Sequence, residues 1–198
     1  ISSSAETSHS GYPAPGAPRA VEEIGQAVRQ PGSGAALGLD KAEWGLDHGT
    51  WSVLKPMFPK ADIPVVQLSM DYSRSPAEHY MLGQQLRELR ERGVLIVGSG
   101  NIVHNLRAIR FDAKPGQAYD WAIEFDKVVG EQIAKGELAA LPSFQKLGQV
   151  AVQAHPTYDH YLPLLYAAGA VDPARDAPKF FNADFQAASI SMRSVIWS

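Results

Sequence analysis

Ser75-Pro76-Ala77-Glu78 opens the stretch that decides the fold class, and Gly93-Val94-Leu95-Ile96-Val97 closes it. Ser75 and Glu78 form a capping-box pattern, and Pro76 occupies the first helical position, where a proline is well tolerated. One face of the predicted helix carries leucines at helical spacing: Leu82, Leu86 and Leu89. Gly93 suits the left-handed residue that ends a helix. The continuously apolar residues 94–97 indicate a strand covered on both faces.

A second buried strand is predicted just upstream, at Ile63-Pro64-Val65-Val66-Gln67-Leu68-Ser69. Strand, helix and strand in this order form a βαβ unit, whose two strands are expected to be parallel and joined by a right-handed crossover. The fold class is therefore α/β. Hydrophobic and capping patterns also predict helices at 19–29, 50–58, 75–93, 120–135, 138–154 and 159–168. They predict one closing, half-exposed strand at 189–195. His79 is expected on the surface of the helix at 75–93.

The composition is that of a globular protein with no large charged surface. The chain has 198 residues, 45% of them hydrophobic and 20% charged, with a net charge of −3. No block of Lys and Arg is present, so nucleic acid is not an expected partner. No apolar run is long enough to span a membrane. Because the chain contains no cysteine, disulfides, thiolate metal sites and cysteine nucleophiles are excluded, and a cytoplasmic location is predicted.

Histidines on predicted loops are the candidate functional residues. His104 follows the apolar segment that ends at Gly98, and ligands of α/β proteins collect at the carboxyl ends of strands. His155 and His160 flank the start of a predicted helix, where the helix dipole disfavours a positively charged imidazole and keeps His160 able to bind a metal. From the residues alone, a surface-loop histidine is the favoured interpretation of His104, and His155 could simply cap the helix. His48, in Asp47-His48-Gly49, could lie in an ordinary turn.

Three motifs in order resemble the DODA-type extradiol ring-cleavage dioxygenases of the LigB-like superfamily. They are Trp44-Gly45-Leu46-Asp47-His48-Gly49-Thr50-Trp51, Gly98-Ser99-Gly100-Asn101-Ile102-Val103-His104-Asn105 and Ala154-His155-Pro156-Thr157-Tyr158-Asp159-His160-Tyr161-Leu162-Pro163. The resemblance runs from about Tyr12 to Trp197. It implies that residues 1–198 form a single catalytic-type domain. The implied fold is a three-layer α/β/α arrangement with a central mixed, partly parallel sheet.

The same resemblance implies a reaction and a set of site residues. The reaction is cleavage of a catechol-type ring by dioxygen at a non-haem Fe(II) or Zn(II) centre. His160 is expected to bind the metal, and His104 to act as the acid/base or as an added metal ligand. His48 is expected to line the substrate cavity as a second catalytic residue. Three further residues are expected to bind substrate or to support those that do: Tyr12, Asn101 and His155.

The N-terminal segment departs from the family pattern. Family members carry two more histidines, in Gly-His-Gly-Ser-Pro and Ser-Ala-His-Trp motifs, and neither motif occurs in this sequence. Ile1-Ser2-Ser3-Ser4-Ala5 is similar to the strand that leads into the second motif, but Glu6 follows it. Our hypothesis is that residues 1–11 are joined fragments of a longer protein.

Two other functions are compatible with the same residues. A non-enzymatic ligand-binding relative would keep the pocket and would not consume dioxygen. A zinc-dependent hydrolase would use the histidines without dioxygen. The substrate and the oligomeric state are not predicted from the sequence.

Overall fold

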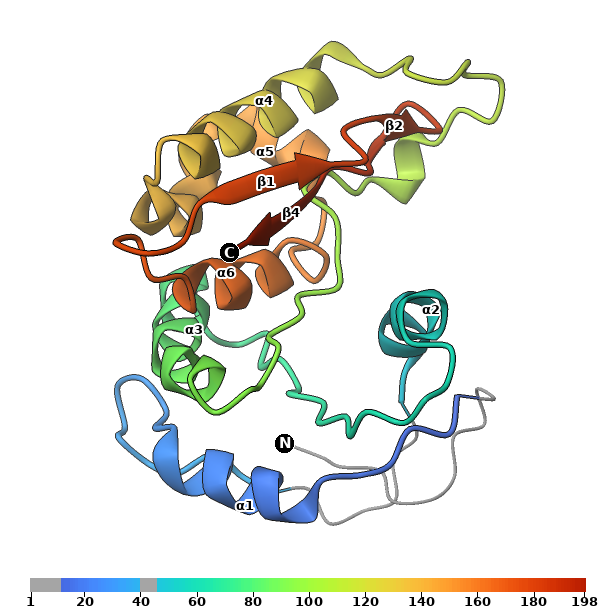
Figure 1. The fold of residues 1–198 in the computed structure, drawn as a ribbon. Coiled ribbons are helices and arrows are strands. Elements are labelled where there is room, and N and C mark those ends of the chain that lie inside the picture. The colour runs from blue at the N-terminus through green and yellow to red at the C-terminus, as the bar shows by residue number, and fades with distance from the viewer. Residues whose placement is uncertain (1–11, 40–45) are drawn as a thin grey trace. The chain divides into compact units, whose positions relative to one another are not determined.

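The computed structural model describes residues 12–39 and 46–198, so the hypothesis about residues 1–11 lies outside the described part of the chain. Helices and short sheets both occur, which confirms the mixed α/β class (Figure 1). The chain divides into two compact units, Ile1–Ser73 and Arg74–Ser198. Each unit is treated below by itself.

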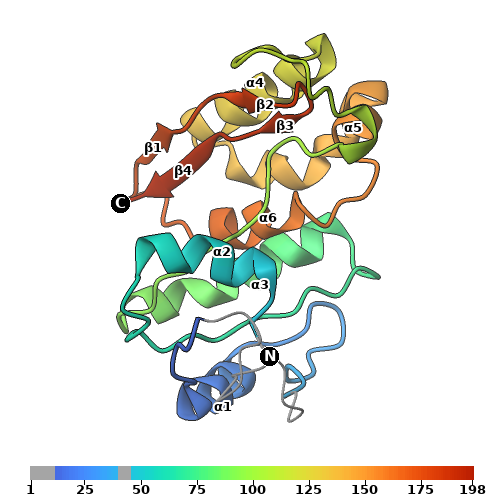
Figure 2. The ribbon, with the colours of Figure 1, turned by 90° about the vertical axis from the view of Figure 1, so that its right-hand side faces the viewer.

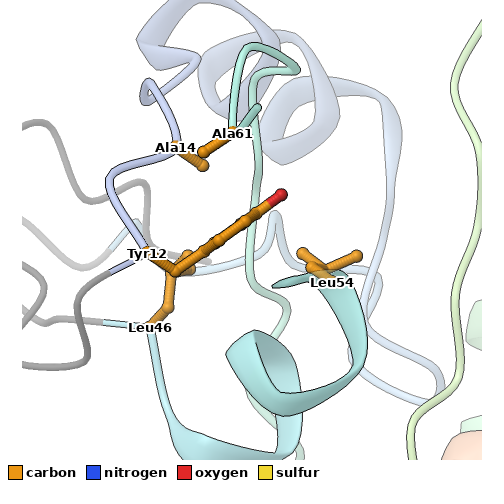
Figure 3. Close-up of a cluster of buried hydrophobic side chains, with 5 residues drawn as sticks. All are labelled: Tyr12, Ala14, Leu46, Leu54 and Ala61. Atoms are coloured by element: carbon orange, nitrogen blue, oxygen red, sulfur yellow. The ribbon is translucent and has the colours of Figure 1, made fainter. Parts of the chain in front are cut away.

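The first unit is organised around a buried tyrosine. It contains α1 (Pro18–Ala27) and α2 (His48–Met57), and the side chain of Asp47 caps α2 by accepting a hydrogen bond from the Thr50 amide. The Tyr12 ring lies within a cluster formed with Ala14, Leu46, Leu54 and Ala61 (Figure 3). Burial of these apolar side chains holds α2 against the chain on either side of it.

The second unit consists of a helical layer and two small sheets. The helices are α3 (Pro76–Arg90), η1 (Leu106–Ala108), α4 (Asp120–Ala134), η2 (Leu138–Leu147), α5 (Gln149–Ala154) and α6 (Leu162–Gly169). Strand β1 (Pro178–Phe181) pairs antiparallel with β4 (Ser194–Trp197), and β2 (Phe185–Gln186) pairs antiparallel with β3 (Ile190–Ser191). Large side chains of its core come from α4, η2 and the region around α6: Phe125, Ile133, Leu141, Phe144, Tyr161, Leu165 and Tyr166.

The helix α3 has the predicted start and a very close neighbour. Ser75 and Glu78 form both hydrogen bonds of the capping box. Its buried face packs along α6 (Figure 2). Gly83 makes this approach possible, because a Cβ atom there would lie 2.4 Å from the Tyr166 carbonyl oxygen. His79 was expected on the surface, but it is fully buried at the same interface, where its Nδ1 lies 2.8 Å from the Tyr166 hydroxyl.

The two predicted buried strands pair less than expected among the described residues. Residues 94–97 have no strand partner among residues 12–39 and 46–198, and Leu95 is 61% exposed. Within residues 63–69, Val65 forms an isolated parallel bridge with Gly16, and Gln67 is a second bridge residue. A strand needs hydrogen bonds from a neighbouring strand, and the described residues provide no ladder at either segment. The parallel pair and the central sheet are therefore absent from the described part of the chain.

Three smaller boundaries also differ from the sequence-based expectation. Residues 138–154 form η2 and α5 rather than one helix, with Pro142 inside η2 and a kink at Ser143. The helix predicted from Asp159 begins at Leu162, because the Asp159 side chain contacts His160 instead of capping a helix. The closing strand is interrupted between β3 and β4. Across 12–39 and 46–198, none of the helices combines the length and the apolarity needed to cross a bilayer.

Candidate functional site

The loop that carries His104 is anchored by its apolar neighbours. Ile102 and Val103 are buried, and the His104 amide donates a hydrogen bond of 3.0 Å to the Ala154 carbonyl. His104 also forms an antiparallel bridge with Ile190. Its backbone is therefore fixed on both sides, while its half-buried imidazole remains partly accessible.

His104 and His160 face each other directly. Their ring centroids lie 3.5 Å apart, and the ring planes differ by 8°. The Asn101 amide donates to the His160 carbonyl at 2.9 Å. A Cβ atom at Gly100 would lie 2.2 Å from that carbonyl oxygen. Glycine at position 100 therefore permits this close approach of two loops.

Asp159 orients the His160 ring. The Asp159 Oδ2 atom lies 2.7 Å from His160 Nδ1. Burial by itself raises the pKa of the Asp159 carboxyl, but a hydrogen bond from Thr157 and the charge of His160 outweigh burial and hold that pKa below its ordinary value. The carboxylate therefore accepts the Nδ1 proton, which leaves Nε2 as the atom of His160 that can bind a ligand.

The environment of His104 favours a neutral ring. Burial is the main cause that lowers the pKa of His104, and the nearby His160 lowers it further, while Asp159 acts in the opposite direction. A neutral imidazole offers one nitrogen as a proton acceptor. His104 is thus suited to accept a proton at neutral pH.

The pair fits part of a metal site. His160 has a carboxylate on Nδ1 and no partner on Nε2 from the described part of the chain, which is the arrangement common for metal-binding histidines. Two nearly parallel stacked rings, however, do not direct their in-plane lone pairs at one ion. No cluster of three His, Cys, Asp or Glu side chains is present within 12–39 and 46–198. The described residues can supply one well-oriented ligand but do not complete a centre by themselves.

His155 lies in the core rather than on the site surface. It is 1% exposed, and its ring contacts those of Phe125, Phe144 and Tyr161. Its Nε2 lies 2.6 Å from the Ile102 carbonyl oxygen, two residues before His104. Direct contact with a substrate stays a prediction, and this burial favours a positioning role for His155.

Burial of His155 predicts a loss of stability in mild acid. Burial lowers the pKa of His155 to about 4, against the opposing effect of its hydrogen bond with Ile102. The unfolded chain binds this proton more readily than the folded one, so the contribution is complete above about pH 6.5 and is lost as pH falls toward about 4. The expected loss is up to about 3 kcal/mol.

Urea unfolding at about pH 7 and about pH 5 measures this effect. His155→Gln is the matched variant, because its amide can still donate to the Ile102 carbonyl but does not titrate. It should be less stable than the wild type at pH 7 and should lose less stability on acidification. An equal loss in both proteins would contradict the prediction.

The remaining predicted site residues have different surroundings. His48 is exposed at the first position of α2. Tyr12 is 2% exposed and donates its hydroxyl to the Phe58 carbonyl at 3.0 Å. Both belong to the first unit, whereas the stacked pair belongs to the second. Asn101 uses its side-chain amide to donate to the Ser191 carbonyl at 2.9 Å. Their assigned roles toward substrate stay predictions.

One buried acidic residue near this site was not singled out from the sequence. Asp126 is 3% exposed and accepts hydrogen bonds from Ser191 and Arg193. Its position in the helix pattern could have identified it, because it lies on the same face as Ala122, Val129 and Ile133. A carboxylate on the apolar face of a helix needs specific partners.

The fold and the site together define an α/β protein with a pair of adjacent loop imidazoles, one of them oriented by a carboxylate. Residues 4–194 match the family described as the catalytic LigB subunit of aromatic ring-opening dioxygenase. The chain belongs to this LigB family.

Similar proteins support the same assignment. The chain is 41% identical over 165 residues to a 4,5-DOPA dioxygenase extradiol of Escherichia coli K12, covering 81% of this chain and 58% of that protein. It is 36% identical over 172 residues to a protein of the same name from Beta vulgaris, covering 86% and 62%. A crystal structure of an uncharacterized protein from Escherichia coli K12 aligns with a TM-score of 0.83 and 35% identity, over 98% of this chain and 78% of that one. The chain thus spans about three fifths of the length of these curated relatives.

Proposed function

We propose that the complete protein opens a catechol-type aromatic ring by extradiol cleavage with dioxygen. Membership of the LigB family and the names of the relatives support this proposal, and those names make 4,5-DOPA the first substrate to test. The observation that carries it is the stacked pair of His104 and His160, with Asp159 bound to the second ring. A partly buried, neutral base next to an oriented metal ligand is what this chemistry requires.

His160 is the proposed metal ligand, through Nε2, and Asp159 holds its ring in place. The metal is Fe(II) or Zn(II), since imidazole suits both. When bound, it would bring the catechol oxygens and dioxygen together at one centre. His104 lies against His160, and its parallel orientation favours the acid/base role over that of an added ligand.

The proposed proton transfer uses the neutral form of His104, which its lowered pKa favours. Its neutral ring would accept a proton from a catechol hydroxyl and return it as the ring opens. The fixed backbone on both sides of His104 keeps the ring in position during this exchange.

Four other residues complete the proposal. His48 would hold a catechol oxygen, and its exposed position at the start of α2 leaves its ring accessible. Asn101 would bind substrate or hold the loop that does so. Tyr12 and His155 would act through their neighbours, because both are buried.

We also propose that residues 1–198 form one catalytic domain in the complete protein, in which residues 63–69 and 94–97 are strands of a central mixed, partly parallel sheet in a three-layer arrangement. Its support is the structural similarity to the solved relative and the apolar, β-branched composition of the two segments. The cytoplasmic location remains the prediction made from composition.

Dioxygen consumption by the full-length protein tests the function. With Fe(II) and 4,5-DOPA, we expect consumption of one dioxygen per catechol and a product that contains both atoms of ¹⁸O₂. Binding of the catechol without dioxygen consumption would support the non-enzymatic alternative instead. Hydrolysis of an ester or amide with zinc and without dioxygen would support the hydrolase.

A further inference from the structure

The backbone around His104 is held by a segment far away in the sequence. The Ser191 amide donates to the Val103 carbonyl at 3.0 Å, and the Asn105 amide donates to the Ser189 carbonyl at 3.2 Å. These bonds lie on either side of His104. The position of its imidazole therefore depends on where Ser189 and Ser191 are placed.

Ser191 also contacts the loop that holds His160. Its carbonyl oxygen accepts a hydrogen bond of 2.9 Å from the Asn101 side chain. The backbone amide of Asn101 in turn donates to the His160 carbonyl at 2.9 Å. A displacement of Ser191 would thus be transmitted to both imidazoles.

Ser191 is attached to a buried carboxylate on α4. Its hydroxyl donates to Asp126 Oδ1 at 2.6 Å. Ser191 is 1% exposed and Asp126 is 3% exposed, so water does not compete for this bond. Arg193 completes the arrangement, with Nε 2.9 Å and Nη2 2.7 Å from Asp126 Oδ2.

The Asp126 carboxylate is well satisfied by these partners. The Arg193 guanidinium neutralises its charge, and its planar pair of donors fixes the carboxylate plane. Asp126 Oδ1 accepts hydrogen bonds from Arg193 Nε and from the Ser191 hydroxyl. The Arg193 amide also donates to Ser191 Oγ at 3.2 Å, which fixes the hydroxyl as well.

We propose that Asp126 is a positioning residue for the His104–His160 pair and that it acts through the Ser191 hydroxyl. As a role in ring cleavage, this inference rests on the proposed function. Its geometric part does not, because the stacking of the two rings can be measured without turnover. A carboxylate that served only to join α4 to the C-terminal strands would need Arg193 but not Ser191.

Ser191→Ala in the full-length protein is the decisive variant. It removes the hydroxyl's bond to Asp126 and the bond that the hydroxyl accepts from the Arg193 amide. It keeps the backbone–backbone hydrogen bonds of Ser191 and the Asp126–Arg193 pair. Ser194→Ala is the matched control, since the Ser194 hydroxyl donates to the Met192 carbonyl and does not contact Asp126. Ser191→Cys, which keeps the shape with a weaker donor, serves if the alanine variant does not fold.

Imidazole ¹H–¹⁵N spectra of the zinc-saturated protein provide the first readout. In Ser191→Ala, the resonances of His104 and His160 should shift, whereas the control should match the wild type. Ser191→Cys should give smaller shifts in the same direction. Unchanged His104 and His160 resonances in Ser191→Ala, or equal shifts in Ser194→Ala, would overturn the inference.

Ring-cleavage kinetics provide the second readout. With the Fe(II) protein, Ser191→Ala should lower kcat about tenfold with KM within about twofold, because misplacement of a reacting group affects the transition state more than binding. Unaltered kcat would reject the role of Asp126 in the reaction. If the His104 and His160 resonances shift in Ser191→Ala but the wild-type protein does not cleave catechols, the positioning role of Asp126 is supported and the proposed function is rejected.

Discussion

His104→Ala should leave the full-length protein loaded with metal and lower kcat for ring cleavage by at least about 100-fold. The side chain lies against His160 in a parallel stack, a geometry in which the two rings do not share one ion. Loss of His104 therefore removes the proton acceptor but not the ligand. Metal analysis together with dioxygen uptake measures both quantities.

His160→Ala is the complementary variant and should abolish metal binding. Its Nε2 is the atom proposed to bind the metal, and Asp159 orients the ring through Nδ1. Each variant serves as the control for the other. Full metal occupancy in His160→Ala would refute the assignment of His160, and unchanged turnover in His104→Ala would refute that of His104.

Gly83→Ala should destabilise the protein, although alanine normally stabilises a helix by about 1 kcal/mol relative to glycine. The added Cβ would lie 2.4 Å from the Tyr166 carbonyl oxygen and 2.8 Å from the Tyr166 Cα atom. Both atoms belong to the backbone of α6, which cannot move aside as a flexible side chain would. Overpacking of this kind typically costs about 1–3 kcal/mol, and separation of α3 from α6 adds to it.

Gly130→Ala is the matched control for this substitution. Gly130 lies inside α4, and the atoms nearest to its Cβ would be those of the flexible Arg193 side chain, at 3.5 Å. It should be neutral or stabilising by up to about 1 kcal/mol. Urea unfolding of both variants measures the difference, and a Gly83→Ala protein as stable as Gly130→Ala would contradict the packing argument.

The local features of the fold could be predicted from the sequence. Ser75 and Glu78 form the capping box that their spacing indicates, and the helix ends close to Gly93. These features depend on hydrogen bonds and side-chain spacing within a few residues, so a single segment contains the information. The motifs around His104 and His160 likewise identified the two imidazoles that the structure brings together.

Contacts between distant residues required the tertiary structure. His79 stands three residues before Leu82, so helical spacing allows it on the leucine face, but only the tertiary structure shows its burial against α6 and its contact with Tyr166. No local pattern distinguishes Gly83 from other helical glycines. The tertiary structure does, because it places the Tyr166 backbone beside Gly83. Residues 94–97 have the composition of a strand, but a strand also needs a partner, which no local pattern supplies.

The sequence by itself determined the capping-box start of α3, the α/β class and the family to which the chain belongs. Only the tertiary structure decided that Asp159 orients His160 instead of capping a helix, and that His155 is a core residue. Only it connected Asp126 to the imidazole pair, across the 65 residues that separate Asp126 from Ser191. The physical reason is that caps and periodicity act over a few residues, whereas burial and side-chain partners depend on which distant segments pack together.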